Sequence, residues 1–201
     1  MSVLINASTS TGLVQSADTS GEIELQSNGT TALKVNTNEG IQILNCLGVG
    51  NATPSTSGAG ITFPATQSAS SDANTLDDYE EGSWTPSLGG TTTYNTQYGR
   101  YTKVGRMVYA SVVIAVNQIG TGSTTQISGL PFTQSGTADA EACWSVASSS
   151  TITTSVVSFT VYSFGTTIYV YSRTAAAQNE SANAIFASGC TVELAGWYQT
   201  S

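Results

Sequence analysis

The segment Met107-Val108-Tyr109-Ala110-Ser111-Val112-Val113-Ile114-Ala115-Val116 is the clearest structural signal in this chain of 201 residues. Because side chains of a strand alternate between its two faces, one face carries an unbroken apolar stripe of Val108, Ala110, Val112, Ile114 and Val116. The other face is amphiphilic and suits contact with a neighbouring subunit; it carries Met107, Tyr109, Ser111, Val113 and Ala115. We therefore predict a strand with one face in a hydrophobic core.

Working outward, the C-terminal part contains several short apolar runs separated by turn residues. We expect strands near residues 91–94, 101–104, 124–127, 140–147, 156–162, 168–171 and 190–198. Phe164-Gly165-Thr166 predicts a hairpin turn between two of these strands. Val157, Phe159 and Val161 would form the core face of the first strand, opposite Ile168 and Val170 of the second. Only residues 175–184 have a helical composition. The spacing of the strands, roughly 8–12 residues, predicts an all-β chain with a C-terminal, jelly-roll-like β-sandwich over residues 84–201.

Residues 1–46 predict a thin β-meander. Strands are expected at 3–5, 22–26, 31–36 and 41–44, with Asn28-Gly29 as a hairpin turn. Each strand offers only two inward apolar side chains, which is too little burial to offset the loss of chain entropy. We therefore predict an intertwined homotrimer that shares one core, and a single sheet packed on the C-terminal domain is the alternative.

Residues 47–83 predict a linker or extended arm that ends in an acidic joint. Turn-forming residues dominate its first part. The joint contains four carboxylates, which precede Trp84 and Pro86: Asp77, Asp78, Glu80 and Glu81. In this interpretation Trp84 anchors the first strand of the sandwich.

The composition argues against two classes of partner. The net charge is −8 and the pI is about 4.1, which disfavours both nucleic acids and anionic membranes. No apolar run approaches the roughly 18 residues that suggest a membrane span.

The N-terminus lacks the features of a signal peptide, so synthesis in a cytoplasm is expected. Cys46, Cys143 and Cys190 are therefore expected to be buried or half-buried free thiols.

The candidate chemistry is sparse. The chain has no histidine, which removes the usual general base and the common nucleophilic triads. The adjacent carboxylates are poorly spaced for glycoside hydrolysis, and ion pairs with the basic residues Arg100, Lys103 and Arg106 are the favoured interpretation. Calcium at the carboxylates and an acidic glycan at the basic residues remain alternatives. We expect no enzyme activity, no metal and no cofactor.

Exposed aromatic side chains are weaker candidates for a contact with glycans. Tyrosine and tryptophan can stack on the apolar faces of sugars, although tyrosine is also a common residue of β-sheets. The candidate residues are Tyr169, Tyr171, Trp197 and Tyr198.

Two runs resemble a module that recurs in tailed-bacteriophage virion proteins, often as the C-terminal domain of tail-fibre-like proteins. The first run is Thr75-Leu76-Asp77-Asp78-Tyr79-Glu80-Glu81-Gly82-Ser83-Trp84-Thr85-Pro86. The second is Tyr98-Gly99-Arg100-Tyr101-Thr102-Lys103-Val104-Gly105-Arg106-Met107-Val108. Later elements of the module match Gly129-Leu130-Pro131-Phe132 and Gly196-Trp197-Tyr198. The resemblance covers residues 75–201, and residues 1–74 loosely resemble stalk repeats.

The resemblance implies a trimeric, non-enzymatic virion protein that is made in the cytoplasm of a bacterial host. Its partners would be copies of itself, other virion proteins of the tail or the major capsid, and a host-surface glycan. A fibre or short spike is the first hypothesis for its function. A capsid decoration (cement) protein is the alternative, and a polysaccharide-degrading tail enzyme is a remote third.

Overall fold

The computed structural model describes residues 22–37, 40–67, 69–136, 142–152, 156–174 and 183–200. Within these ranges the regular structure is entirely β, which confirms the predicted fold class. The strand expected at residues 3–5 and the helical composition at 175–182 lie outside the described residues. The chain forms two compact units, Met1–Thr66 and Gln67–Ser201, and each is described by itself.

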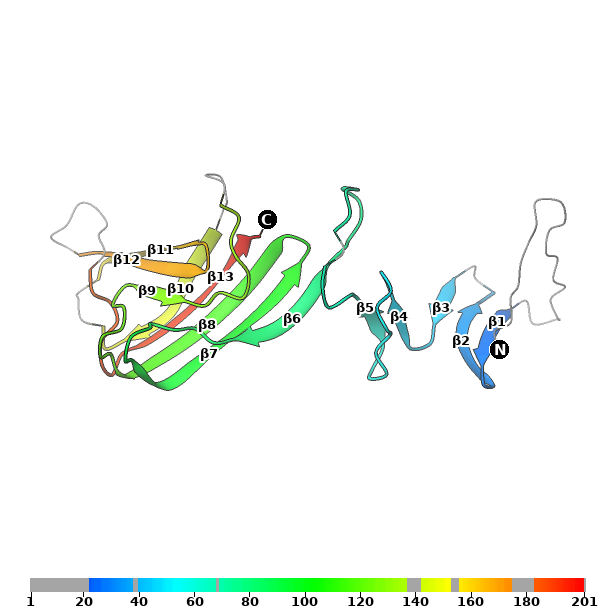
Figure 1. Cartoon of the computed structure of the whole chain (residues 1–201), viewed down its shortest axis with the longest axis horizontal. Coiled ribbons are helices and arrows are strands. Elements are labelled where there is room, and N and C mark those ends of the chain that lie inside the picture. The colour runs from blue at the N-terminus through cyan, green and yellow to red at the C-terminus, as the bar shows by residue number, and fades with distance from the viewer. Residues whose placement is uncertain are drawn as a thin grey trace. The chain divides into compact units, whose positions relative to one another are not determined.

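The N-terminal unit contains two small sheets (Figure 1). Strands β1 (Ile23–Ser27), β2 (Thr30–Val35) and β3 (Ile41–Ile43) form an antiparallel sheet. Asn28 and Gly29 have φ angles of 49° and 75°, as a tight two-residue hairpin turn requires, which confirms the predicted turn. Strands β4 (Cys46–Gly48) and β5 (Gly60–Thr62) pair in parallel, so the strand-like piece within the predicted linker joins a sheet.

The three-stranded sheet is amphipathic, and nothing among the described residues covers its apolar side. Cross-strand pairing forms two apolar rows, Ile23–Val35–Ile41 and Leu25–Leu33–Ile43. We call these six side chains the apolar face. Ile41 is 71% exposed and Leu25 52%. Of the residues in this unit whose burial the structure describes, none is buried. The unit therefore has no hydrophobic core within its described residues.

The C-terminal unit is a two-layer sandwich (Figure 1). The larger sheet is antiparallel with the order β10-β13-β8-β7-β6, and its strands are β6 (Tyr79–Trp84), β7 (Thr93–Val104), β8 (Met107–Gln118), β10 (Ala142–Ser150) and β13 (Thr191–Gln199). The smaller sheet has the order β11-β12-β9 and contains β9 (Gln126–Ser128), β11 (Ser158–Phe164) and β12 (Thr167–Arg173).

The core lies between the two sheets and is built around β8. The predicted apolar stripe of β8 is at most 1% exposed at every position, which confirms that prediction. Ile127, Ile168 and Val170 of the smaller sheet are fully buried in the same cluster. The β11–β12 hairpin turns at Gly165 and Thr166, as expected. Val157 was wrongly expected in the core; it is 62% exposed because it precedes β11 and lies beyond the core cluster.

Strands β6 and β7 interlock through two reciprocal pairs of an aromatic residue with a glycine. Gly82 is the cross-strand partner of Tyr101, and Gly99 is that of Trp84. A Cβ on Gly82 would lie 2.6 Å from Tyr101 Cζ, and one on Gly99 would lie 2.7 Å from Trp84 Cδ1. A side chain at either position would overlap the aromatic ring of its partner, so both positions require glycine. Trp144 covers its partner Gly196 in the same way, between β10 and β13.

The acidic joint differs from its prediction. Residues 79–84 form β6, the edge strand of the larger sheet, and the compact unit already begins at Gln67. The ladder with β7 runs without interruption from Trp84–Gly99 to Tyr79–Val104. Charged residues and a glycine are unusual in a strand, so only the pairing with β7 reveals this element.

Candidate functional site

Asp78 and Lys103 form a buried ion pair on the inner side of the larger sheet. Asp78 is 5% exposed and Lys103 4%, and Lys103 Nζ contacts Asp78 Oδ2. Lys103 Nζ also lies 5.4 Å from the centroid of the Phe132 ring, a cation–π distance. Among the described residues, this pair agrees with the ion-pair interpretation for Asp78 and Lys103 alone. Both side chains are buried in the interior of the unit.

The other three carboxylates of this stretch have separate partners. Asp77 accepts a hydrogen bond from the Ser70 backbone N–H at 2.7 Å, and this bond lowers the pKa of Asp77. Glu80 accepts a hydrogen bond from the Tyr101 hydroxyl and Glu81 one from Tyr79. Across the parts of the chain that the structure describes, no group of three or more His, Cys, Asp or Glu residues is placed to hold a metal ion.

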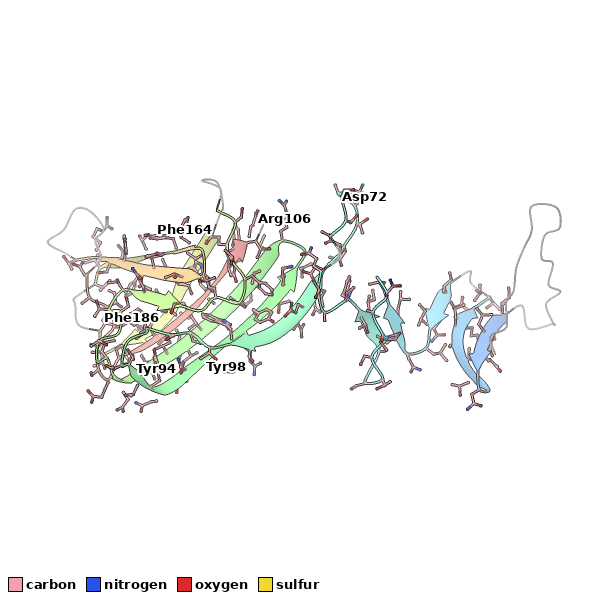
Figure 2. The ribbon with its side chains drawn as sticks, viewed as in Figure 1. Asp72, Tyr94, Tyr98, Arg106, Phe164 and Phe186 are labelled. Carbon is pink, nitrogen blue, oxygen red and sulfur yellow. The ribbon has the colours of Figure 1, made fainter. Side chains whose placement is uncertain are left out.

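The three basic residues lie apart from one another. Arg100 and Lys103 are an odd number of positions apart on β7, so they lie on opposite faces of the sheet. Arg106 is exposed in the β7–β8 turn (Figure 2). Arg100 Nε donates a hydrogen bond to the Tyr98 hydroxyl at 2.6 Å, and its guanidinium carbon is 5.4 Å from the centroid of that ring. Sequence reasoning grouped these residues because they are close in the chain.

The four candidate aromatic residues also do not form one site. Tyr169 and Tyr171 alternate with buried residues of β12 and are half-buried beside Tyr162. Trp197 is half-buried on β13. Tyr198 is fully buried and its hydroxyl accepts a hydrogen bond from the Phe132 N–H at 3.3 Å, so it is unsuited to contact a glycan. Adjacent strand residues point to opposite faces, which separates Trp197 from Tyr198.

Trp84 is an anchor of the sandwich, in agreement with the role suggested for it. Its indole is 7% exposed, and Nε1 donates a hydrogen bond to the backbone oxygen of Ser111 at 3.2 Å. All three cysteines are free, but only Cys46 and Cys190 are half-buried and buried as expected. Cys143 is exposed because it alternates with buried Trp144 on the edge strand β10.

An open depression on β6, β7 and β8 is the best candidate for a binding site. Its volume is about 560 Å³, and it is lined by Glu81, Gly82, Ser83, Tyr98, Arg100, Tyr101, Thr102, Tyr109 and Ser111. Tyr98 and Tyr109 are 43% and 53% exposed. We call this feature the tyrosine–arginine depression. It combines aromatic surface, a guanidinium, a carboxylate and three aliphatic hydroxyl groups.

Sequence reasoning missed this depression, although part of its signal was present. Tyr98, Arg100 and Thr102 alternate along β7 and so share one face of the sheet. Tyr109 and Ser111 belong to the amphiphilic face of the strongest strand. The register Ser83–Arg100–Ser111, which brings the three strands together, comes only from the structure.

Comparison of the chain with protein-family models, with curated proteins and with solved structures found no match. Among the residues with described positions, no helix has the length and hydropathy needed to span a membrane.

Tyr101 leads to a prediction about alkaline pH. The hydrogen bond to Glu80 raises the pKa of Tyr101 from 10.0 to about 12. A raised folded-state pKa stabilises the fold fully below the unfolded-state pKa, and that contribution is lost as the pH rises through about 12. As the pH is raised from about 10 to about 12, we expect the urea concentration at the midpoint of unfolding to decrease. The decrease should be smaller in Tyr101→Phe. Equal decreases in the two proteins would contradict this role.

Proposed function

We propose that this chain is a structural protein of a bacteriophage virion, a trimeric fibre or short spike whose C-terminal sandwich contacts the host surface. The uncovered apolar face of β1, β2 and β3 is the observation that carries the proposal. A protein that keeps such a face needs a partner to cover it. A virion contains many copies of each structural protein, and each copy supplies the same surface.

Another copy of the chain suits this face because the face is apolar and carries no charge. Covering a half-exposed Leu or Ile contributes on the order of 1 kcal/mol, and each copy offers four such side chains, Ile23, Leu25, Ile41 and Ile43. The charged residues next to them pair within the sheet: Lys34 Nζ lies 2.6 Å from Glu22 and 3.8 Å from Glu24. Three copies related by a threefold axis would bury the three faces in one core.

The resemblance to phage virion proteins supports the same proposal. Its first two runs contain Gly82, Trp84, Gly99 and Tyr101, which are the residues that interlock β6 and β7. The resemblance therefore involves positions with a physical role in this sheet. We propose that the protein is made in the cytoplasm of the bacterial host and resides in the virion, where other virion proteins are its partners.

A capsid decoration protein is the second candidate. The parallel β4–β5 pair carries further exposed apolar residues, Leu47 at 41% and Ile61 at 56%. A unit with apolar residues on two separate small sheets could contact more than one neighbouring subunit. The number of copies in purified virions, measured by quantitative mass spectrometry, separates the candidates. Tens of copies favour the tail, hundreds favour the capsid, and absence from virions rejects both.

Self-association can be tested with two adjacent residues of β3. Ile41→Asp would introduce a carboxylate into the proposed shared core, and burial of unpaired carboxylates is strongly unfavourable. We expect the wild-type chain to sediment as a trimer and Ile41→Asp to associate at least a hundredfold more weakly. The control is Gln42→Asp, which adds the same charge at an exposed position on the opposite face. A monomeric wild-type chain, or equal association of the two variants, would reject the proposed interface.

A further inference from the structure

We infer that the tyrosine–arginine depression binds a carboxylate-bearing sugar unit of a surface polysaccharide. This inference rests on the proposed function, because it names the ligand class for the host-contacting sandwich. Binding itself is a property of the isolated protein, so it can be tested without a virion. The argument uses three properties of the depression: its aromatic surface, its cation and its hydroxyl groups.

The aromatic surface comes from two tyrosines on neighbouring strands. Tyr98 of β7 and Tyr109 of β8 both line the depression and are 43% and 53% exposed. Large aromatic side chains with this exposure offer an apolar ring and a polar hydroxyl to a ligand. A pyranose ring has one apolar C–H face and a polar rim, so it can pack on such a surface while its hydroxyl groups remain hydrogen-bonded.

The cation is Arg100, and its charge is not neutralised by an ion pair in the described part of the chain. The ion pairs formed there use Lys34 and Lys103 instead. The bond to Tyr98 occupies only Nε of the five-donor guanidinium fork. The terminal N–H groups therefore remain for a ligand, and a planar carboxylate matches them with two parallel hydrogen bonds.

The remaining polar groups suit a sugar better than a densely charged polymer. Ser83, Thr102 and Ser111 supply hydroxyl groups, and Glu81 supplies a carboxylate that accepts hydrogen bonds. The volume of about 560 Å³ is within the usual range for small-ligand sites. A single arginine beside Glu81, in a chain of net charge −8, opposes nucleic acids and other polyphosphates. One negative charge per sugar fits this balance.

The experiment measures binding of acidic oligosaccharides to the full chain by calorimetry and saturation-transfer NMR. The probes are tetragalacturonate, a hyaluronan tetrasaccharide and sialyllactose, and fully methyl-esterified tetragalacturonate is the uncharged counterpart of the first. We expect at least one acidic probe to bind. We expect esterification to weaken binding at least tenfold if tetragalacturonate is that probe. Failure of all three acidic probes to bind at millimolar concentration, or equal binding of the ester, would overturn the inference.

Variants then locate the site. Arg100→Gln and Tyr109→Ser alter exposed side chains and are each expected to weaken binding at least tenfold, with unchanged thermal unfolding. Arg106→Gln removes the same charge from the exposed β7–β8 turn and should leave affinity within twofold of wild type. Equal affinities of Arg100→Gln and Arg106→Gln would overturn the assignment.

The failure of this inference can be distinguished from that of the proposed function. Mass spectrometry that finds the protein in virions, together with no binding of any acidic probe, rejects the site and keeps the virion function. Binding that depends on Arg100, together with absence from virions, keeps the site and rejects the virion function.

Discussion

Asp78→Ala is expected to lower the free energy of unfolding of the C-terminal unit by about 3–5 kcal/mol. The change leaves the Lys103 ammonium buried at 4% exposure without the carboxylate that it contacts. Phe132, whose ring centroid lies 5.4 Å from Lys103 Nζ, compensates for only part of this loss. Urea unfolding followed by tryptophan fluorescence measures the effect, because Trp84 and Trp144 are in the core of this unit.

The neighbouring residue provides a matched control. Asp77→Ala removes the same charge from a half-buried position where the carboxylate accepts the Ser70 N–H. We expect a smaller loss than in Asp78→Ala, about 0.5–1.5 kcal/mol. The double variant Asp78→Leu with Lys103→Met replaces the pair by apolar side chains and should recover most of the stability lost in Asp78→Ala. The buried-pair argument is refuted if Asp77→Ala and Asp78→Ala destabilise equally, or if the double variant is less stable than Asp78→Ala.

Gly99→Ala is expected to destabilise the same unit by about 1–3 kcal/mol. Its new methyl group would lie 2.7 Å from Trp84 Cδ1, and other indole atoms would be closer still. The indole cannot move away cheaply, because it is 7% exposed and hydrogen-bonded to Ser111. Alanine would ordinarily be tolerated better than glycine in a strand, so the ring alone accounts for the sign of the effect.

Two comparisons isolate the contact with the ring. Gly136→Ala adds a methyl group at a position with no other atom within 4 Å, and we expect little change or slight stabilisation. In a Trp84→Ala background, Gly99→Ala should cost almost nothing, because the overlapping ring is absent. A cost of Gly99→Ala that is the same with and without Trp84 would show that the interlock of β6 and β7 does not depend on this contact.

Much of the fold could be predicted because local alternation of side chains is visible in the chain. Met107–Gln118 forms one strand with its apolar stripe buried, as the pattern of residues 107–116 indicates. The Asn28-Gly29 turn was equally clear, since few residues adopt positive φ readily. Strand β6 was missed, because its sequence resembles a solvated joint and its pairing with β7 joins residues 15 to 25 positions apart, from Trp84–Gly99 to Tyr79–Val104.

The candidate site was harder to predict than the fold. Proximity in the chain suggested that Arg100, Lys103 and Arg106 act together, and that Trp197 and Tyr198 do. Alternation along β7 and β13 separates the members of each group. The exposed partners of Arg100 are instead Tyr98, two positions away, and residues of β6 and β8 that the sheet register brings beside it.

The sequence alone was sufficient for the all-β class, the strongest strand, the hairpin turns, the acidic charge and the lack of histidine chemistry. These depend on composition and on contacts between residues close in the chain. Only the tertiary structure could show which acidic residue is buried with Lys103, which aromatic rings cover glycines, and that Tyr98, Arg100 and Tyr109 line one depression. These depend on strand register and on the side of each sheet that is buried, and both are set by packing between residues far apart in the chain.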